Sequence, residues 1–292
     1  MNIYDVFDDN TNKEENAGFN KEEWIKQKQQ QREKAYELVE ATCEKILLGG
    51  EAFKDYLTVQ GRFDRYSVTN AILVSAQMPN AVKIKEYKKW KAERVFVNKG
   101  ANKIIILEPG KEYVRDDGKR AVSYNAKVMY DISDTSAKDK IRQEKPYGMR
   151  QLLSALIDAS PAAFQPTDDL NVPAFYDGEN QTIFVKTGLL EEELFKAVTK
   201  EISAAIYHVK FNESRESSSF KSYCVAFMIA SKYGIDTSDF NFDKSTDVFK
   251  NLDSQTLKRE LGSMRDVLGE IQTEMYRNFE KNKTVKNREQ ER

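Results

Sequence analysis

Residues 62–79 read RFDRYSVTNAILVSAQMP and hold a short helix together with its start and its stop. Ser67 can cap the first free backbone N–H groups, and Pro79 cannot continue a helix. The apolar run between them predicts a helix over 68–77. Arg62, Arg65 and Tyr66 come just before the cap, so two cations and one aromatic ring are expected beside one helix N-terminus.

The sequence on either side of this helix predicts a mixture of helices and strands. A first helix is expected from Asn20, with Glu23 completing a capping box, to the Gly49-Gly50 pair that ends it. The other elements predicted in this half are two helices, three strands and a turn, at 51–60, 85–92, 94–97, 103–107, 122–131 and 98–100. Residues 1–20 are polar and acidic, and we expect a disordered tail there.

The second half of the chain begins after a polar stretch at 136–146 that ends at Pro146, which we interpret as a linker. It separates two expected domains, 21–135 and 147–280, and a polar tail follows at 281–292. The elements predicted in the second domain are four helices and one hairpin, at 147–159, 191–209, 220–233, 254–279 and 173–185. The expected fold class is therefore α+β with two domains: N-terminal helices with a small antiparallel sheet, then a mostly helical domain with a small β-hairpin.

The composition of the 292 residues excludes several classes of protein. No stretch approaches the roughly 20 uncharged apolar residues of a membrane span, and the acidic N-terminus is unlike a secretory signal. Cys43 and Cys224 cannot form a disulfide framework, so a cytoplasmic protein without membrane partners is expected. The single histidine, His208, excludes a metal site built from several histidines.

The charges are unevenly distributed along the chain. Residues 57–112 contain 11 Lys and Arg against 5 acids, a net charge of +6 in a chain whose total is −1. A basic segment in an otherwise acidic protein is typical of proteins that bind polyanions. The alternative is an ordinary solvated face.

The stretch at 62–79 continues through Tyr87 and Trp90 to VNKGANKIIILEP at 97–109. In this order, an arginine, Tyr-Ser, an asparagine, Gln-x-Pro, a tryptophan, a Lys-Gly turn and a strand ending in proline resemble one known domain. It is the N-terminal single-stranded-DNA-binding domain of ArdC-type antirestriction proteins, which plasmids and integrative conjugative elements encode. The resemblance implies single-stranded DNA as a partner.

Single strands are held by cations along the backbone and by aromatic faces on which bases stack. The candidate binding residues are Arg62, Arg65, Tyr66, Ser67, Asn70, Gln77, Lys83, Lys85, Tyr87, Lys88, Lys89, Trp90, Lys99, Gly100 and Lys103. Each has a structural alternative: Tyr66 and Trp90 can be core aromatics, Asn70 can bond the backbone, and the lysines can serve solubility alone.

A second block resembles the zincin-like metallopeptidase domain of the same proteins. It comprises YDGENQTIFV at 176–185, ELFKAVTKEISAAIYH at 193–208 and VAFMIASKYGIDTSDF at 225–240. The metallopeptidase motif is His-Glu-x-x-His on a helix, in which two imidazoles bind zinc and the glutamate activates water. Here the motif reads Lys200-Glu201-Ile202-Ser203-Ala204, so both histidines are replaced.

The third metal ligand of such domains is an acid on the next helix, and Tyr223 stands there instead. Residues 217–235 contain no Asp or Glu at all. The resemblance therefore implies a pseudoenzyme with no catalytic residues, no metal and no cofactor, whose degenerate site is marked by Lys200, Glu201, Ala204 and Tyr223. We expect Glu201 to be a structural acid; Lys200 and Lys221 are open as partners, and the sequence favours neither.

Together these features predict non-catalytic binding of single-stranded DNA for a bacterial mobile genetic element, in conjugative transfer or in antirestriction. One alternative is a protein–protein interaction module, in which the pseudo-zincin groove holds a host or element-encoded protein. Another alternative is a residual hydrolase.

Overall fold

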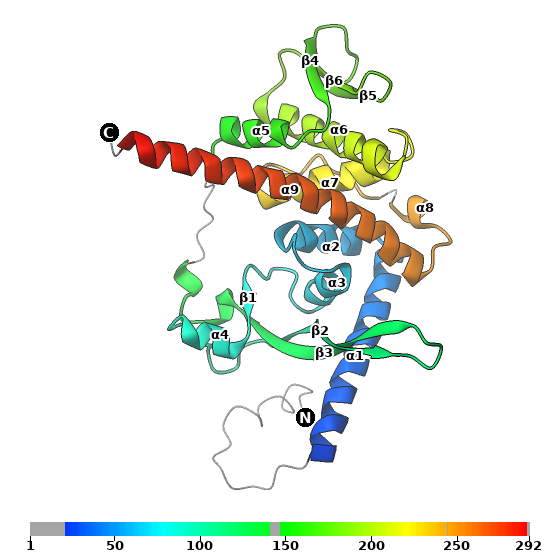
Figure 1. Ribbon diagram of the computed structural model, residues 1–292, viewed down its shortest axis with the longest axis vertical. Coiled ribbons are helices and arrows are strands. Elements are labelled where there is room, and N and C mark those ends of the chain that lie inside the picture. The colour runs from blue at the N-terminus through cyan, green and yellow to red at the C-terminus, as the bar shows by residue number, and fades with distance from the viewer. Residues whose placement is uncertain (1–20, 141–146, 244, 291–292) are drawn as a thin grey trace. The chain divides into compact units, whose positions relative to one another are not determined.

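The structure is a computed structural model that describes residues 21–140, 147–243 and 245–290 (Figure 1). The expected N-terminal tail, its capping residue Asn20 and the last six residues of the expected linker lie outside the described residues. The fold class is α+β, as the sequence predicts, with two small sheets among longer helices.

The chain divides into two compact units that do not follow a single cut. One unit contains residues up to 42 together with 72–142, and the other contains 43–71 together with 143–292. The last passage of the chain from one unit to the other, at 142/143, falls within the expected linker. The first unit is nevertheless interrupted, because residues 43–71 group with the C-terminal half. The division passes through helix α1 (Lys21–Leu48) and helix α3 (Val68–Gln77).

The N-terminal unit is built around a three-stranded antiparallel sheet of order β1-β3-β2. Its strands are β1 (Ile84–Lys85), β2 (Ile104–Val114) and β3 (Arg120–Asp131), and helix α4 (Tyr87–Ala92) lies at the opposite end of the sheet from the β2–β3 turn (Figure 1). The side chain of Asp131 accepts the N–H groups of Val82 at 2.7 Å and Lys83 at 2.8 Å, which fixes the entry to β1.

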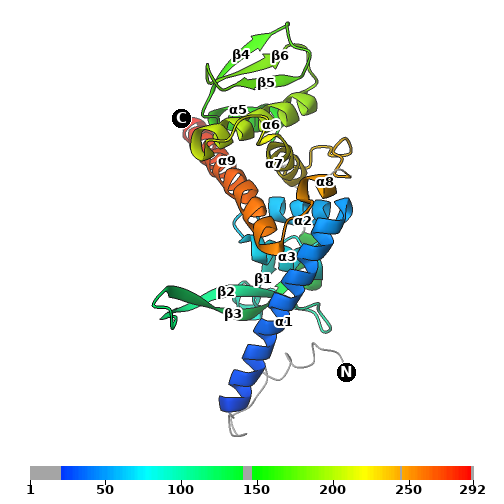
Figure 2. The same cartoon turned by 90° about the vertical axis from the view of Figure 1, so that its right-hand side faces the viewer.

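The C-terminal unit consists of a helical core covered by a small mixed sheet. Helix α7 (Ser219–Lys232) packs against α2 (Gly50–Arg62), α6 (Glu191–Phe211) and α9 (Ser254–Gln290). Strands β4 (Ala163–Thr167), β6 (Thr182–Lys186) and β5 (Ala174–Asp177) form a layer beside α6 and α5 (Met149–Asp158), as Figure 2 shows. A short helix, α8 (Ser245–Phe249), precedes α9.

Most predicted elements are present, with differences at their edges. The β5–β6 hairpin is antiparallel as predicted, but β4 stood in a stretch predicted as a loop and pairs parallel to β6. Residues 94–97 form no strand and contribute one isolated bridge, Val97 with Thr135. Helix α9 continues to Gln290, so the predicted polar tail from 281 is helical over its described part. Cys43 and Cys224 are buried free thiols.

Within the residues that the structure describes, no helix has the length and apolar character needed to cross a bilayer.

Candidate functional site

The candidate DNA-binding residues do not all fall in one unit. Arg62, Arg65, Tyr66, Ser67 and Asn70 belong to the C-terminal unit, whereas the candidates from Gln77 to Lys103 belong to the N-terminal unit. The two groups are therefore described separately.

The loop after α2 is tied to α7 and α9 by a polar network. The carboxylate of Asp64 accepts from Lys232 Nζ at 2.8 Å and from Tyr276 Oη at 3.1 Å. Burial lowers the pKa of Lys232 below its usual range, which Asp64 partly offsets. The Arg65 guanidinium lies 5.7 Å from the centre of the Tyr276 ring. Arg65 thus has an intramolecular partner among the packed helices.

The other candidates of this stretch also hold the fold together. The Tyr66 ring packs 5.1 Å from that of Phe63, and its carbonyl accepts from Arg265 Nε at 3.1 Å. Ser67 Oγ accepts the N–H of Asn70 at 3.2 Å, the bond of a helix N-cap, as predicted. Arg62 and Asn70 are half-buried and have contacts of their own.

Two candidates of the N-terminal unit are structural. Gln77 donates to the carbonyl of Ile105 at 2.9 Å and accepts its N–H at 2.9 Å, which joins α3 to β2. Trp90 is 1% exposed, and its indole N–H bonds the carbonyl of Tyr130 at 2.9 Å. The structure therefore corrects the assignment of Trp90 as a stacking face, because a base cannot reach a ring in the core. Lys103 is also buried.

The lysines around α4 differ in whether a carboxylate neutralises them. Lys85 pairs with Glu93, and Lys89 pairs with Glu86 at 3.1 Å. Lys83, Lys88 and Lys99 are exposed, and no carboxylate among the described residues pairs with them. The Lys83 ammonium lies over the Trp90 ring, 6.0 Å from its centre. Gly100 has a φ of +81°, a turn conformation that glycine tolerates best.

The N-terminal unit also exposes several aromatic side chains. Tyr87, a sequence candidate, is 40% exposed, but Phe96, Tyr113 and Tyr124 were not candidates and are 64%, 48% and 40% exposed. Tyr36 of α1 is close to Tyr124: burial raises the pKa of Tyr36, and the Tyr124 hydroxyl adds to that rise. Tyr113 and Tyr124 lie on the ends of β2 and β3 near their connecting turn, and no local pattern in the sequence distinguishes them from core aromatics.

A pocket of about 340 Å³ in the C-terminal unit brings together most of the degenerate zincin positions. Lys200, Glu201 and Tyr223 line it, whereas Ala204 is buried one turn further along α6 and is not a lining residue. The remaining lining residues are Val172, Pro173, Ala174, Glu193, Lys196, Ala197, Arg215, Ala226, Asp239 and Phe240. The pocket therefore combines apolar walls with several charges.

The carboxylate of Glu201 accepts three hydrogen bonds from the protein. Arg215 donates through Nε to Oε2 at 2.7 Å and through Nη2 to Oε1 at 2.8 Å, and the backbone N–H of Tyr176 donates to Oε2 at 2.9 Å. The Glu201 side chain is only 3% exposed. Neither of the two partners left open by the sequence pairs with Glu201: Arg215 does, and Lys221 pairs with Glu213 at 2.5 Å.

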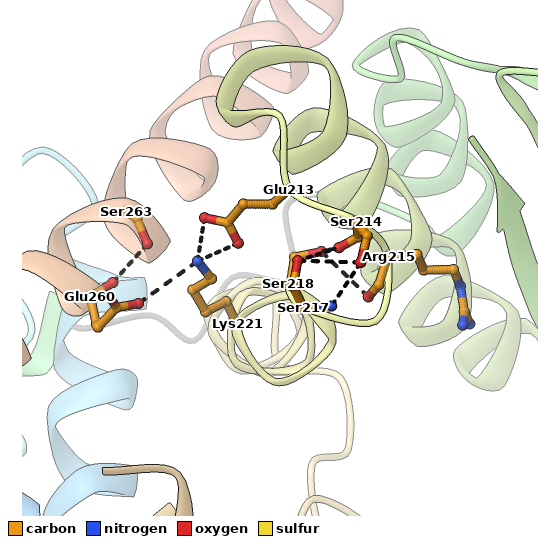
Figure 3. A network of polar contacts seen from close by, with 8 residues as sticks. All are labelled: Glu213, Ser214, Arg215, Ser217, Ser218, Lys221, Glu260 and Ser263. Carbon is orange, nitrogen blue, oxygen red and sulfur yellow. Dashed lines mark hydrogen bonds and ion pairs between the residues drawn. The ribbon is translucent and has the colours of Figure 1, made fainter. Parts of the chain in front are cut away.

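The loop that carries Arg215 is held by short-range hydrogen bonds. The hydroxyls of Ser217 and Ser218 both donate to the carbonyl of Ser214, each at 2.9 Å. Figure 3 shows the Arg215 side chain pointing away from this serine cluster and from the Lys221 pairs. The Arg215 guanidinium also lies 4.5 Å from the centre of the Phe175 ring. Both features fix its approach to Glu201.

The remaining candidates for chemistry have structural partners. His208 Nδ1 is 3.0 Å from Tyr176 Oη. Tyr223 Oη accepts the N–H of Asn241 at 2.8 Å. Burial in an apolar helix raises the pKa of the Cys224 thiol well above its usual value, so it is protonated at neutral pH.

The residues around Glu201 do not fit a metal ion. Both carboxylate oxygens are taken by Arg215 and the Tyr176 N–H, and Lys200 brings a further cation to the same pocket. Among the described residues, no group of three or more His, Cys, Asp or Glu side chains could hold a metal.

No protein-family model and no curated protein sequence matches this chain. Solved structures do. The metal-free crystal structure of the antirestriction protein ArdC from plasmid R388 has a TM-score of 0.58 at 14% identity, over 82% of this chain and 98% of that chain. Its Mn(II)-bound crystal structure has a TM-score of 0.54 at 13% identity, with the same coverage. The chain therefore has the fold of ArdC.

Proposed function

We propose that this protein binds single-stranded DNA without catalysing a reaction, in the antirestriction or transfer system of a bacterial mobile element. Two things support the proposal: the ArdC fold, extending over 98% of a plasmid antirestriction protein, and the basic segment at 57–112. An antirestriction role fits both, because entering DNA that is coated by protein is shielded from host enzymes.

The observation that carries the proposal is the set of exposed cations in the N-terminal unit. Lys83, Lys88 and Lys99 have no carboxylate partner among the described residues, although Glu86 and Glu93 lie on the same segment and pair with other lysines. A phosphate backbone would supply the missing negative charge and release its counterions. Ordinary surface lysines could stay solvated, so this set alone gives no preference for single strands.

Exposed aromatic rings supply that preference. Tyr87 follows the lysine-rich loop, and Phe96, at 64% exposure, lies two residues before the Asn98-Lys99-Gly100 turn. A base stacked on such a ring is worth roughly 1–3 kcal/mol and requires an unpaired strand. Cations beside exposed rings are therefore the combination that single-strand binding needs.

The test is fluorescence anisotropy with single- and double-stranded oligonucleotides of about 30 nucleotides at several salt concentrations. Lys83, Lys88 and Lys99 are replaced together with Ala, and the matched control replaces the paired lysines, Lys85 and Lys89. The first variant should lower the slope of log affinity against log salt by about 2, because each phosphate contact contributes roughly 0.7 for a single strand. The control should change it by less than half as much. Equal effects, or a wild type that does not bind, would refute the proposal.

The non-catalytic part of the proposal rests on Glu201. A glutamate that activates water must present a carboxylate oxygen to that water, whereas both oxygens of this one face Arg215 and the side chain is 3% exposed. Metal analysis of the purified protein tests this: zinc or manganese near one equivalent per chain would contradict it.

A second candidate function is a protein-interaction module. It is favoured by the pocket in the C-terminal unit, which is large enough for a side chain of a partner. A pull-down in which protein and not DNA is recovered would support it.

A further inference from the structure

We infer that the pocket beside the Arg215–Glu201 pair binds a small organic carboxylate: an apolar, preferably aromatic, group that carries one carboxylate. The inference is independent of DNA binding, because every residue it uses lies in the C-terminal unit and outside the basic segment.

One of the cations that line the pocket has no counterion among the acids that line it. Three cations and three acids line it, but two of the acids are already neutralised. Glu201 forms an ion pair with Arg215, and Asp239 accepts a hydrogen bond from Lys196 Nζ at 2.7 Å.

Lys200 is the remaining cation, and it is half-buried. No described residue forms an ion pair or hydrogen bond with its ammonium group. The remaining acid, Glu193, is exposed and lies two helical turns before Lys200, roughly 10 Å along α6. An ammonium that is partly removed from water and has no counterion is a natural partner for an anion.

Two further donors line the same pocket. Arg215 spends Nε and Nη2 on Glu201, and no described residue accepts from its Nη1. Tyr223 Oη accepts the N–H of Asn241, so its own hydrogen is left for another acceptor. Burial raises the pKa of Tyr223, so the phenol is protonated at neutral pH. Lys200, Arg215 and Tyr223 thus offer donors to one anion.

The rest of the pocket wall is apolar and would contact the part of the ligand that carries no charge. Small apolar surfaces come from Val172, Ala174, Ala197 and Ala226. The ring centres of Tyr223 and Phe240 are 4.8 Å apart, with an angle of 44° between the ring planes. A volume of about 340 Å³ is at the small end of ligand pockets. An aromatic acid of the size of an N-acylated amino acid matches these walls. The source of such a group can be a free acid or the C-terminal residue of a peptide.

The experiment measures binding of N-acetyl-L-phenylalanine and of its uncharged amide by isothermal titration and by NMR line shifts on the full chain. The acid should bind roughly ten- to a hundredfold more tightly than the amide, as expected for hydrogen bonds to a charged group. Lys200→Met should abolish this preference, and Lys200→Arg should keep most of it. Lys186→Met, an exposed lysine outside the pocket, is the matched control and should bind as the wild type does.

A second pair of probes, a tripeptide ending in phenylalanine with a free or an amidated C-terminus, distinguishes the two sources. If N-acetyl-L-phenylalanine binds more tightly than the tripeptide with a free C-terminus, the ligand is a small metabolite-like acid. If the tripeptide binds more tightly, the ligand is the C-terminus of a protein. Thermal unfolding of each variant confirms that the fold is intact. Equal binding of acid and amide, no binding of any probe at 10 mM (on the order of the weakest useful affinities), or a preference that survives in Lys200→Met would overturn the inference.

Discussion

Replacing Arg215 with Met should destabilise the protein by about 3 kcal/mol. The variant loses the guanidinium over Phe175 and leaves the Glu201 carboxylate, 3% exposed, with only the Tyr176 N–H. Removing one partner of a buried ion pair costs about 3–5 kcal/mol. We take the lower end because the Arg215 side chain is 24% exposed and water can enter its place. For a unit of this size, the melting temperature should fall by roughly 6–12 °C.

The cost should depend on pH in a defined direction. Without Arg215, the carboxylate is buried beside a single remaining donor, so its negative charge costs the folded state more than the unfolded chain. In acid the carboxyl group is uncharged in both states and the variant loses least. As the pH rises from 4 to 7 the charge must be buried, and the variant becomes less stable relative to wild type.

Differential scanning calorimetry of the full chain at pH 4 and pH 7 measures both effects. Glu201→Gln on top of Arg215→Met should restore most of the lost stability, because the neutral amide still accepts the Tyr176 N–H. Arg277→Met is the matched control: its ion pair with Glu274 is exposed and should contribute less than about 1 kcal/mol. A loss below 0.5 kcal/mol (roughly the effect of an ordinary surface substitution), or an equal loss at both pH values, would refute the reasoning.

Three other substitutions test the packing and the turns. Gly61→Ala should cost about 2 kcal/mol or more in urea unfolding, because the new Cβ would lie 2.6 Å from the Met228 carbonyl oxygen. Gln77→Leu should cost about 1–3 kcal/mol in the same assay, because both backbone groups of Ile105 lose their partner. Hydrogen bonds from the β5–β6 turn lower the pKa of Asp177, so its contribution is present above about pH 4. The gap in melting temperature between wild type and Asp177→Ala should therefore close as the pH falls through that lowered pKa.

Local signals predicted the longer helices and the β5–β6 hairpin, but not the short helix α8 or every strand. The segment AFQPT at 163–167 carries a proline and little alternation, so it resembled a loop. It becomes strand β4 because it pairs in parallel with β6 at an edge of the sheet, where Pro166 is tolerated. Such pairing depends on the tertiary fold and leaves no local pattern.

The candidate site was predicted in part for a similar reason. The sequence correctly placed Lys200 and Glu201 on one helix, but it left the partner of Glu201 open between Lys200 and Lys221. The observed partner, Arg215, lies in the following loop and reaches Glu201 only because the chain reverses after α6. Trp90 could not be assigned from sequence, because a basic segment around a tryptophan looks the same whether the ring is buried or exposed.

The strongest support for the proposal of a non-catalytic C-terminal unit is the ion pair between Arg215 and Glu201. A carboxylate as buried as that of Glu201 needs a neighbouring positive charge. Here the Arg215 guanidinium supplies it and bonds both oxygens. On our proposal, the pairing that stabilises the fold also occupies the oxygens that a general base would use, and the two replaced histidines and Arg215 belong to one change. What remains is a pocket with donors in excess, which suits the binding of an anion and not the activation of water.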